Sequence, residues 1–172
     1  MEDIKVLISK RKIERRLKKL ANQIDKDYEG KEITAICVLK GATIFAVELT
    51  LKMKSKIQFE FIKISSYDGR ESTNKINNEL DIEKEKIEGK DVLIIEDIVD
   101  TGNSMNYLIN HIKEKNPNSL KVCVLLNKPS RRKVEVPIDY IGFEVPNKFI
   151  VGYGFDDEKE LNRNLPYIGY KE

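Results

Sequence analysis

The segment Asp100-Thr101-Gly102-Asn103-Ser104 has the residue types of an anion-binding pocket. It lies between an apolar strand pattern and a helical pattern, so it is expected to open a helix. Gly102 permits a tight backbone turn, and exposed main-chain amides at the helix N-terminus can surround a negative charge together with the hydroxyls of Thr101 and Ser104. These five residues therefore predict a binding site for a phosphate monoester.

Two carboxylates, Glu96 and Asp97, come shortly before this segment. They would repel a phosphate, but they can accept hydrogen bonds from sugar hydroxyls, favour a cationic transition state or bind a divalent metal ion. An isolated acidic pair is more often only a polar connection between a strand and a helix, and Asp100 would then be only a helix cap. The acidic pair, the glycine turn and Ser104 together predict a site for a 5-phosphoribosyl group.

The elements that must position these residues alternate between strand and helix. Asp91–Ile95 is apolar on both faces, which is typical of a central parallel strand covered by helices. Further strands are predicted at Ile4–Ile8, Ile33–Leu39, Ile57–Ser65, Leu120–Leu126, Tyr140–Phe143 and Phe149–Val151. Helical spacing begins after Ser9, spans Thr43 to Met53 and recurs from Met105 to Ile112. We expect an α/β fold with a twisted parallel sheet flanked by helices and a site at the carboxyl ends of the strands.

A polar stretch interrupts this alternation. Ser66–Glu79 is rich in Ser, Asn and charged residues and shows no helical face, so it is predicted to be a long loop of the kind that covers binding sites. The segment Asp81–Ile87 after it is interpreted as a short polar segment, with a strand returning from the loop as one alternative.

Composition excludes several classes of protein. A chain of 172 residues predicts one domain, residues 1–172. The 31 Lys and Arg nearly cancel the 29 Asp and Glu, which gives no general attraction to nucleic acid or membranes. The basic stretch Lys10–Lys19 is expected to be a solvated helix face. We expect no signal peptide and no membrane span.

Cysteine and histidine usage narrows the chemistry further. Cys37 and Cys123 lie in apolar runs, which favours buried thiols in a reducing cytoplasm over a disulfide framework. A single histidine, His111, excludes a site built from several histidines, and it is interpreted as a surface or packing residue.

The stretch from Val92 to Gly102 resembles the phosphoribosyl-diphosphate motif of type I phosphoribosyltransferases. Other segments resemble the branch that acts on 6-oxopurines, and the resemblance spans essentially the whole chain: Val38–Ala42, Ser65–Tyr67, Leu125–Pro129 with Arg131-Arg132, Lys148–Gly154 and Arg163–Gly169. It implies transfer of a 5-phosphoribosyl group to N9 of hypoxanthine or guanine, giving IMP or GMP plus pyrophosphate. It also implies a small hood from about residues 1–10 and 140–172, and a mobile loop over about 66–80 that begins with Ser66 and Tyr67.

The resemblance assigns roles around the sugar and the pyrophosphate. Residues Asp100 to Ser104 would hold the 5-phosphate, and Glu96 and Asp97 the ribose hydroxyls. Lys40, Gly41 and Arg163 would contact pyrophosphate, and the Leu39–Lys40 peptide is often cis in the family. Mg²⁺ would be bound through Glu96, Asp97 and Asp156. Asn162 stands where the family commonly has an aromatic residue, and the spacing from Asp156 to Arg163 is about one residue long, so Asp157 is a second candidate for the metal.

The resemblance also assigns the purine site and the proton transfer. Asp100 would act as general base or acid at N7, Lys128 would donate to the 6-oxo group, Phe149 would stack on the base and the Ile150 backbone would read its edge. Lysine only donates hydrogen bonds, so it suits a 6-oxo acceptor and not a 6-amino group. Taken alone, Lys128 would be interpreted as a solvated lysine and Phe149 as a core residue.

Two other functions remain open at this stage. One is a regulatory RNA-binding protein on the same scaffold, and the other is a receiver-like signalling domain with Glu96, Asp97 and Lys128 as its acidic pocket and lysine. The expected partners are the purine base and phosphoribosyl diphosphate, with no nucleic acid and no membrane, in a cytoplasmic homodimer or homotetramer. The preference among hypoxanthine, guanine and xanthine stays open.

Overall fold

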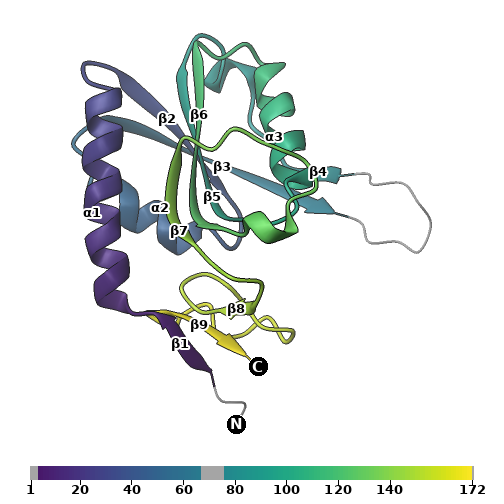
Figure 1. The fold of residues 1–172 in the computed structure, drawn as a ribbon. Coiled ribbons are helices and arrows are strands. Elements are labelled where there is room, and N and C mark those ends of the chain that lie inside the picture. The colour runs from purple at the N-terminus through teal and green to yellow at the C-terminus, as the bar shows by residue number, and fades with distance from the viewer. Residues whose placement is uncertain (1–3, 67–75, 172) are drawn as a thin grey trace.

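The computed structural model describes residues 4–66 and 76–171, and it is built around one six-stranded sheet (Figure 1). The strand order is β4-β3-β2-β5-β6-β7. The strands are β2 (Glu32–Val38), β3 (Lys56–Ser66), β4 (Ile76–Leu80), β5 (Asp91–Val99), β6 (Ser119–Asn127) and β7 (Tyr140–Glu144). All neighbouring pairs from β3 to β7 are parallel, whereas β4 pairs antiparallel with β3 at the edge. The predicted parallel sheet is therefore a mixed sheet.

Helices cover both faces of this sheet, as the continuous apolar runs of its central strands require. Leu93 and Ile95 of β5 belong to a core that also contains buried residues of α1 (Lys10–Asp27) and α2 (Thr43–Thr50). Val92 and Ile94 point to the opposite core, which is closed by α3 (Asn103–Lys113). Successive side chains of a strand face opposite sides, so a strand that is apolar at every position needs a helix layer on each side.

A second, three-stranded sheet forms the hood. Its order is β1-β9-β8, with β1 at Lys5–Ile8, β9 at Ile168–Lys171 and β8 at Phe149–Val151. Figure 1 shows it at the end of the molecule where both termini lie. The hood was predicted to begin at about residue 140, but Tyr140–Glu144 pairs with β6 in the main sheet, so the C-terminal part of the hood begins after Glu144.

The predicted loop Ser66–Glu79 is wrong at both ends. Ser66 is the last residue of β3, and Ile76–Leu80 is strand β4, which pairs with β3 so that Ser65 faces Asn77. An edge strand is held by backbone hydrogen bonds and can carry polar side chains, so β4 shows no apolar alternation. The alternative of a strand within Asp81–Ile87 is also wrong, since that segment contains a short 3₁₀ turn at Lys84–Lys86. Tyr67 lies outside the described residues, and the roles of Ser66 and Tyr67 stay predictions.

Strand β5 extends four residues beyond its predicted end at Ile95. It continues to Val99 because the parallel ladder to β6 continues, with Glu96 opposite Val124 and Ile98 opposite Leu126. The acidic pair therefore lies within the strand, not after it, and the rigid sheet fixes the backbone of both carboxylates.

The residues singled out by composition lie where their types suggest. Cys37 and Cys123 are free and buried, and burial raises the pKa of both thiols. His111 packs between Asn78 and Asp81, with its Nε2 atom 2.9 Å from the Asp81 carboxylate oxygens. No helix in residues 4–66 and 76–171 has the length and apolar character needed to cross a bilayer.

Candidate active site

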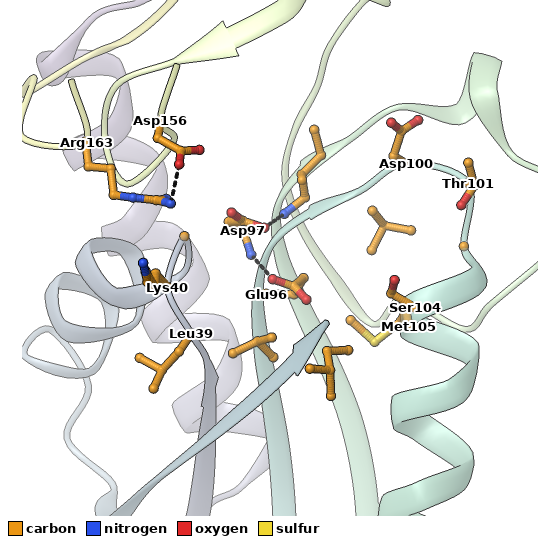
Figure 2. A pocket seen from close by; sticks show the side chains of 16 residues that line it. Leu39, Lys40, Glu96, Asp97, Asp100, Thr101, Ser104, Met105, Asp156 and Arg163 are labelled. Carbon is orange, nitrogen blue, oxygen red and sulfur yellow. Dashed lines mark hydrogen bonds and ion pairs between the residues drawn. The ribbon is translucent and has the colours of Figure 1, made fainter. Parts of the chain in front are cut away.

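An open cavity of about 390 Å³ lies at the carboxyl ends of β2 and β5. Its walls include most of the residues predicted to bind the sugar, the phosphate and the pyrophosphate: Lys40, Gly41, Glu96, Asp97, Asp100, Thr101, Gly102, Ser104, Asp156 and Arg163. Figure 2 shows Lys40, Arg163 and Asp156 on one side, Thr101 and Ser104 on the other, and the acidic pair between them. Sequence reasoning missed two apolar walls, Ile64 and Met105.

The predicted phosphate turn forms at the start of α3. Gly102 is the N-cap residue with φ +89°, a left-handed conformation that favours glycine. A Cβ atom at this position would lie 2.1 Å from the carbonyl oxygen of Val134, so the turn also needs a residue without a side chain. Thr101 and Ser104 line the cavity, whereas Asn103 does not. The backbone of Asn103 nevertheless takes part in the turn, since its amide donates to Thr101 Oγ1 at 3.4 Å.

The two carboxylates of β5 are partly buried in the cavity wall. Burial and the neighbouring Asp97 raise the pKa of Glu96 well above its usual range, and burial also raises the pKa of Asp97. The Asp97 amide donates to Glu96 Oε1 at 2.8 Å, and the Ile98 amide donates to Asp97 Oδ1 at 2.6 Å. Two adjacent, partly buried carboxylates favour a cation near them, whether a metal ion or a developing sugar cation.

The cationic side of the cavity is built from a loop of the main sheet and a turn of the hood. The Leu39–Lys40 peptide is cis, as the resemblance implied. Gly41 lies directly against Asp97, because a Cβ at Gly41 would be 1.7 Å from Asp97 Oδ2. On the hood side, Arg163 donates to Asp156 Oδ2 and to the Gly154 carbonyl, both at 2.6 Å. These bonds fix the guanidinium at the cavity edge.

The irregular segment before Arg163 is a closed turn. Asp157 Oδ1 accepts hydrogen bonds from the amides of Lys159 and Leu161 at 2.9 and 3.0 Å, and Oδ2 accepts from Asn162 Nδ2 at 2.8 Å. These backbone bonds lower the pKa of Asp157. Asn162, with φ +71°, thus closes a turn in place of the family's aromatic residue. Asp157 is occupied by this turn, so Asp156 is the better candidate ligand.

Asp100 combines burial with an unused acceptor. Its Oδ1 atom is buried and accepts no hydrogen bond from any described residue, although Arg131 Nε lies 3.1 Å away as an ion pair. Arg132 Nε donates to the Asp100 carbonyl at 3.2 Å, and its Nη2 atom donates to Asn127 Oδ1. Sequence reasoning quoted both arginines only as part of the resemblance and assigned them no role.

The three predicted purine residues do not line this cavity. Lys128 is nevertheless next to it, since its amide donates to the Val99 carbonyl at 3.0 Å. Its Nζ donates to the Lys148 carbonyl at 2.8 Å, which brings Lys128 beside Phe149. Burial lowers the pKa of Lys128, against the raising effect of Asp100. Lys128 is 7% exposed and Phe149 is 47% exposed, so the lysine is not a solvated residue and the ring is not a core residue.

The donor set suits a hard divalent cation that is shared with a substrate. In the described ranges no three acidic, histidine or cysteine side chains converge in the manner of an all-protein metal cage. Magnesium is typically bound by one or two carboxylates together with water and substrate phosphate oxygens. Glu96 and Asp97 on the strand and Asp156 on the hood offer such ligands on the cavity wall.

Comparison with known proteins gives the family. A model described as the phosphoribosyl transferase domain matches residues 5–158. The hypoxanthine-guanine phosphoribosyltransferase of Streptococcus thermophilus is 42% identical over 166 residues, which cover 96% of this chain and 91% of that protein. The chain belongs to the phosphoribosyltransferase family. The predicted family and fold are thereby confirmed.

Other phosphoribosyltransferases show the same likeness over different lengths. A crystal structure of the hypoxanthine-guanine phosphoribosyltransferase from Bacillus anthracis has a TM-score of 0.93 and 43% identity, covering 99% of this chain and 100% of that chain. The bifunctional protein TilS/HprT of Listeria monocytogenes is 42% identical over 166 residues, and the match covers 96% of this chain. The chain spans only 25% of the length of that bifunctional relative.

Proposed function

We propose that this phosphoribosyltransferase transfers the 5-phosphoribosyl group from phosphoribosyl diphosphate to N9 of a 6-oxopurine, hypoxanthine or guanine. The main support for the proposal is the order in which an anion-binding turn, an acidic pair and two cationic side chains follow one another along a single cavity. The Thr101–Gly102 turn suits the 5-phosphate, Glu96 and Asp97 suit the ribose, and Lys40 with Arg163 suits the pyrophosphate. Phosphoribosyl diphosphate presents an anion, a sugar and a second anion in the same order.

The reaction follows from what these groups stabilise. The bond from C1 of the ribose to pyrophosphate breaks with its electron pair on the leaving oxygen, and positive charge develops on the sugar. Glu96 and Asp97 stabilise that charge, while Lys40 and Arg163 stabilise the charge on pyrophosphate. The lone pair of N9 forms the new bond to C1, and the proton on N7 passes to the Asp100 carboxylate, which is partly exposed at the cavity wall.

Mg²⁺ is the expected cofactor. Glu96, Asp97 and Asp156 would hold it, together with oxygens of the substrate. When bound, it neutralises charge on the pyrophosphate and so makes it a better leaving group. The acidic pair supports this assignment, because two adjacent carboxylates in the cavity wall favour a cation beside them.

The base would lie beside Asp100, next to the cavity. Lys128 Nζ uses one of its three donors on the Lys148 carbonyl, which leaves donors for a 6-oxo group. The exposed ring of Phe149 offers a stacking surface, and the adjacent Ile150 offers its backbone. Adenine presents a donor at the same place, and its binding would leave a buried lysine facing another donor.

Location and assembly are part of the same proposal. Two buried, unpaired thiols support a reducing cytoplasm as the site of the reaction. A homodimer or homotetramer is expected from the family resemblance, and analytical ultracentrifugation of the purified chain would measure it.

One experiment tests the function. The purified protein is given phosphoribosyl diphosphate and Mg²⁺ with hypoxanthine, guanine, xanthine or adenine in turn, and nucleotide formation is measured. We expect turnover with hypoxanthine or guanine and little with adenine. Turnover with adenine alone, or with none of the four bases, would overturn the proposal. Retention of RNA on a filter at physiological salt, without purine turnover, would instead favour the regulatory RNA-binding alternative.

A further inference from the structure

A buried tyrosine in the hood makes a hydrogen bond to the helix that follows the pyrophosphate loop. Tyr153 is 3% exposed, and its hydroxyl donates to Glu48 Oε2 of α2 at 2.6 Å. Burial and the Glu48 carboxylate raise the pKa of Tyr153, so its hydroxyl remains protonated and acts as the donor. The two residues are 105 positions apart in the sequence. Their bond joins the hood to α2, which packs on the main sheet.

The backbone around Tyr153 is held in an unusual conformation. Gly152, Tyr153 and Gly154 have φ values of +92°, +51° and +102°. The left-handed region is unfavourable for a tyrosine, by about 1–2 kcal/mol. The turn is held by hydrogen bonds from the Tyr153 amide to the Leu165 carbonyl and from the Gly154 amide to the Arg163 carbonyl, both 2.9 Å. Such strain persists only where the surrounding contacts fix the conformation.

The same turn touches the pyrophosphate side of the active site at two points. A Cβ atom on Gly154 would lie 2.1 Å from the Gly41 carbonyl oxygen, so the two backbones are in direct contact. The Gly154 carbonyl accepts a hydrogen bond from Arg163 Nη1 at 2.6 Å. On the other side, Thr43 Oγ1 at the start of α2 donates to the Lys40 carbonyl at 2.6 Å. Tyr153 is thus next in sequence to Gly154, which contacts Gly41 and Arg163. Glu48 lies in the helix whose first residue, Thr43, bonds to Lys40.

We propose that Tyr153 and Glu48 are positioning residues that set the separation between Arg163 and the Lys40–Gly41 loop, and so determine affinity for the pyrophosphate group. The inference rests on the proposed function for the identity of the anion. Without the Tyr153–Glu48 bond, the apolar packing of Tyr153 and Phe155 in the core shared with α2 and the Gly154–Gly41 contact would still hold the hood. The hydrogen bond that fixes the Tyr153 turn relative to α2 would be lost.

The surroundings of the bond allow it to be removed without collapse of the core. Tyr153 and Glu48 line a separate cavity of about 220 Å³ between α1, α2 and the hood. Water can enter a cavity of this size and solvate Glu48 when the tyrosine hydroxyl is absent. The Tyr153→Phe variant keeps the buried ring and is expected to fold.

The chain offers a matched control for this variant. The Tyr140 hydroxyl also donates to a carboxylate, Asp27 Oδ2, at 2.6 Å, and Tyr140 is 2% exposed. Neither Tyr140 nor Asp27 lines the active-site cavity. Tyr140→Phe therefore removes an equivalent bond and its contribution to stability without touching the hood. Glu48→Gln keeps an acceptor oxygen for Tyr153, whereas Glu48→Ala removes it.

The test is binding of magnesium pyrophosphate by titration calorimetry, with initial rates against both substrates as a second measurement. Tyr153→Phe and Glu48→Ala should raise the Kd for magnesium pyrophosphate and the KM for phosphoribosyl diphosphate about fivefold to twentyfold. The KM for hypoxanthine should stay within about twofold, and Glu48→Gln should restore pyrophosphate binding.

Two results would overturn the inference. One is an equal loss of pyrophosphate affinity in Tyr153→Phe and Tyr140→Phe, which would show a general stability effect. The other is a parallel rise in the KM for both substrates. Failure of the proposed function looks different, because the wild-type protein would then turn over no purine base, while the calorimetric comparison of the two tyrosine variants would still decide the positioning role.

Discussion

Replacing Gly41 by alanine tests whether the acidic pair must sit where β5 places it. The added Cβ would lie 1.7 Å from Asp97 Oδ2 and 2.8 Å from Asp97 Cγ, whereas ordinary contact begins at 3.4 Å. The carboxylate oxygen must therefore move by about 1.7 Å, or the Lys40–Gly41 loop must move away from it. Either movement separates groups that are proposed to act on the same ribosyl pyrophosphate.

The size of the effect follows from that displacement. A misplacement of about 1 Å in a catalytic constellation can cost about 100-fold in rate. We expect kcat/KM for phosphoribosyl diphosphate to fall by about 100-fold or more in Gly41→Ala, measured by steady-state formation of IMP. The clash involves the end of a side chain, and Gly41 has no left-handed φ, so the free energy of unfolding should change by less than about 1 kcal/mol.

Gly89→Ala is the matched control. Gly89 has φ +69°, and a Cβ there meets nothing within 4 Å. The substitution should lower the free energy of unfolding by about 1 kcal/mol through backbone strain and leave turnover unchanged. Wild-type kcat/KM in Gly41→Ala, with a stability like that of wild type, would refute the view that the Gly41–Asp97 contact fixes the site.

Three further variants test other parts of the structure. Asp100→Asn should lower kcat with hypoxanthine by about 10²–10⁴-fold, because the amide cannot accept the N7 proton as a base. Lys128→Gln should lower the ratio of hypoxanthine to adenine turnover by at least about tenfold, since an amide can donate or accept. Asp81→Asn should be less stable than wild type to urea at pH 7. Burial alone would raise the pKa of Asp81, but hydrogen bonds with His111 and Lys115 lower it below 3.8, so the difference should shrink as the pH falls below about 3.8.

The central strands could be predicted because their burial is visible in the sequence. Strands β2, β5 and β6 are covered on both faces, and such strands are apolar at nearly every position. Strand β4 could not be predicted, because its backbone pairing with β3 sets its structure and Asn77, Asn78 and Glu79 are polar. The same applies to the end of β5, where pairing with β6 keeps the chain extended through Glu96 and Asp97.

For the candidate site, too, parts that are contiguous in sequence could be predicted, whereas contacts between distant segments could not. The turn from Asp100 to Ser104 is contiguous in sequence, so its residue types were sufficient to predict that it opens a helix. The contacts of Gly154 with Gly41 and of Tyr153 with Glu48 join segments more than a hundred residues apart, and no local pattern marks them. Arg131 beside Asp100 is a similar case, because only the folded chain brings the η2 turn (Pro129–Arg131) over the end of β5.

The two cations proposed to bind pyrophosphate, Lys40 and Arg163, are held differently in this structure. Lys40 lies 4.0 Å from Glu160, and both side chains are more than half exposed, so this pair contributes little to stability. In the proposed complex, Lys40 would exchange Glu160 for oxygens of pyrophosphate. Arg163 is held more firmly, by Asp156 and the Gly154 carbonyl. One cation of the pyrophosphate side is therefore free to move toward the ligand while the other is already oriented, and the orientation of the second depends on the hood turn that Tyr153 anchors.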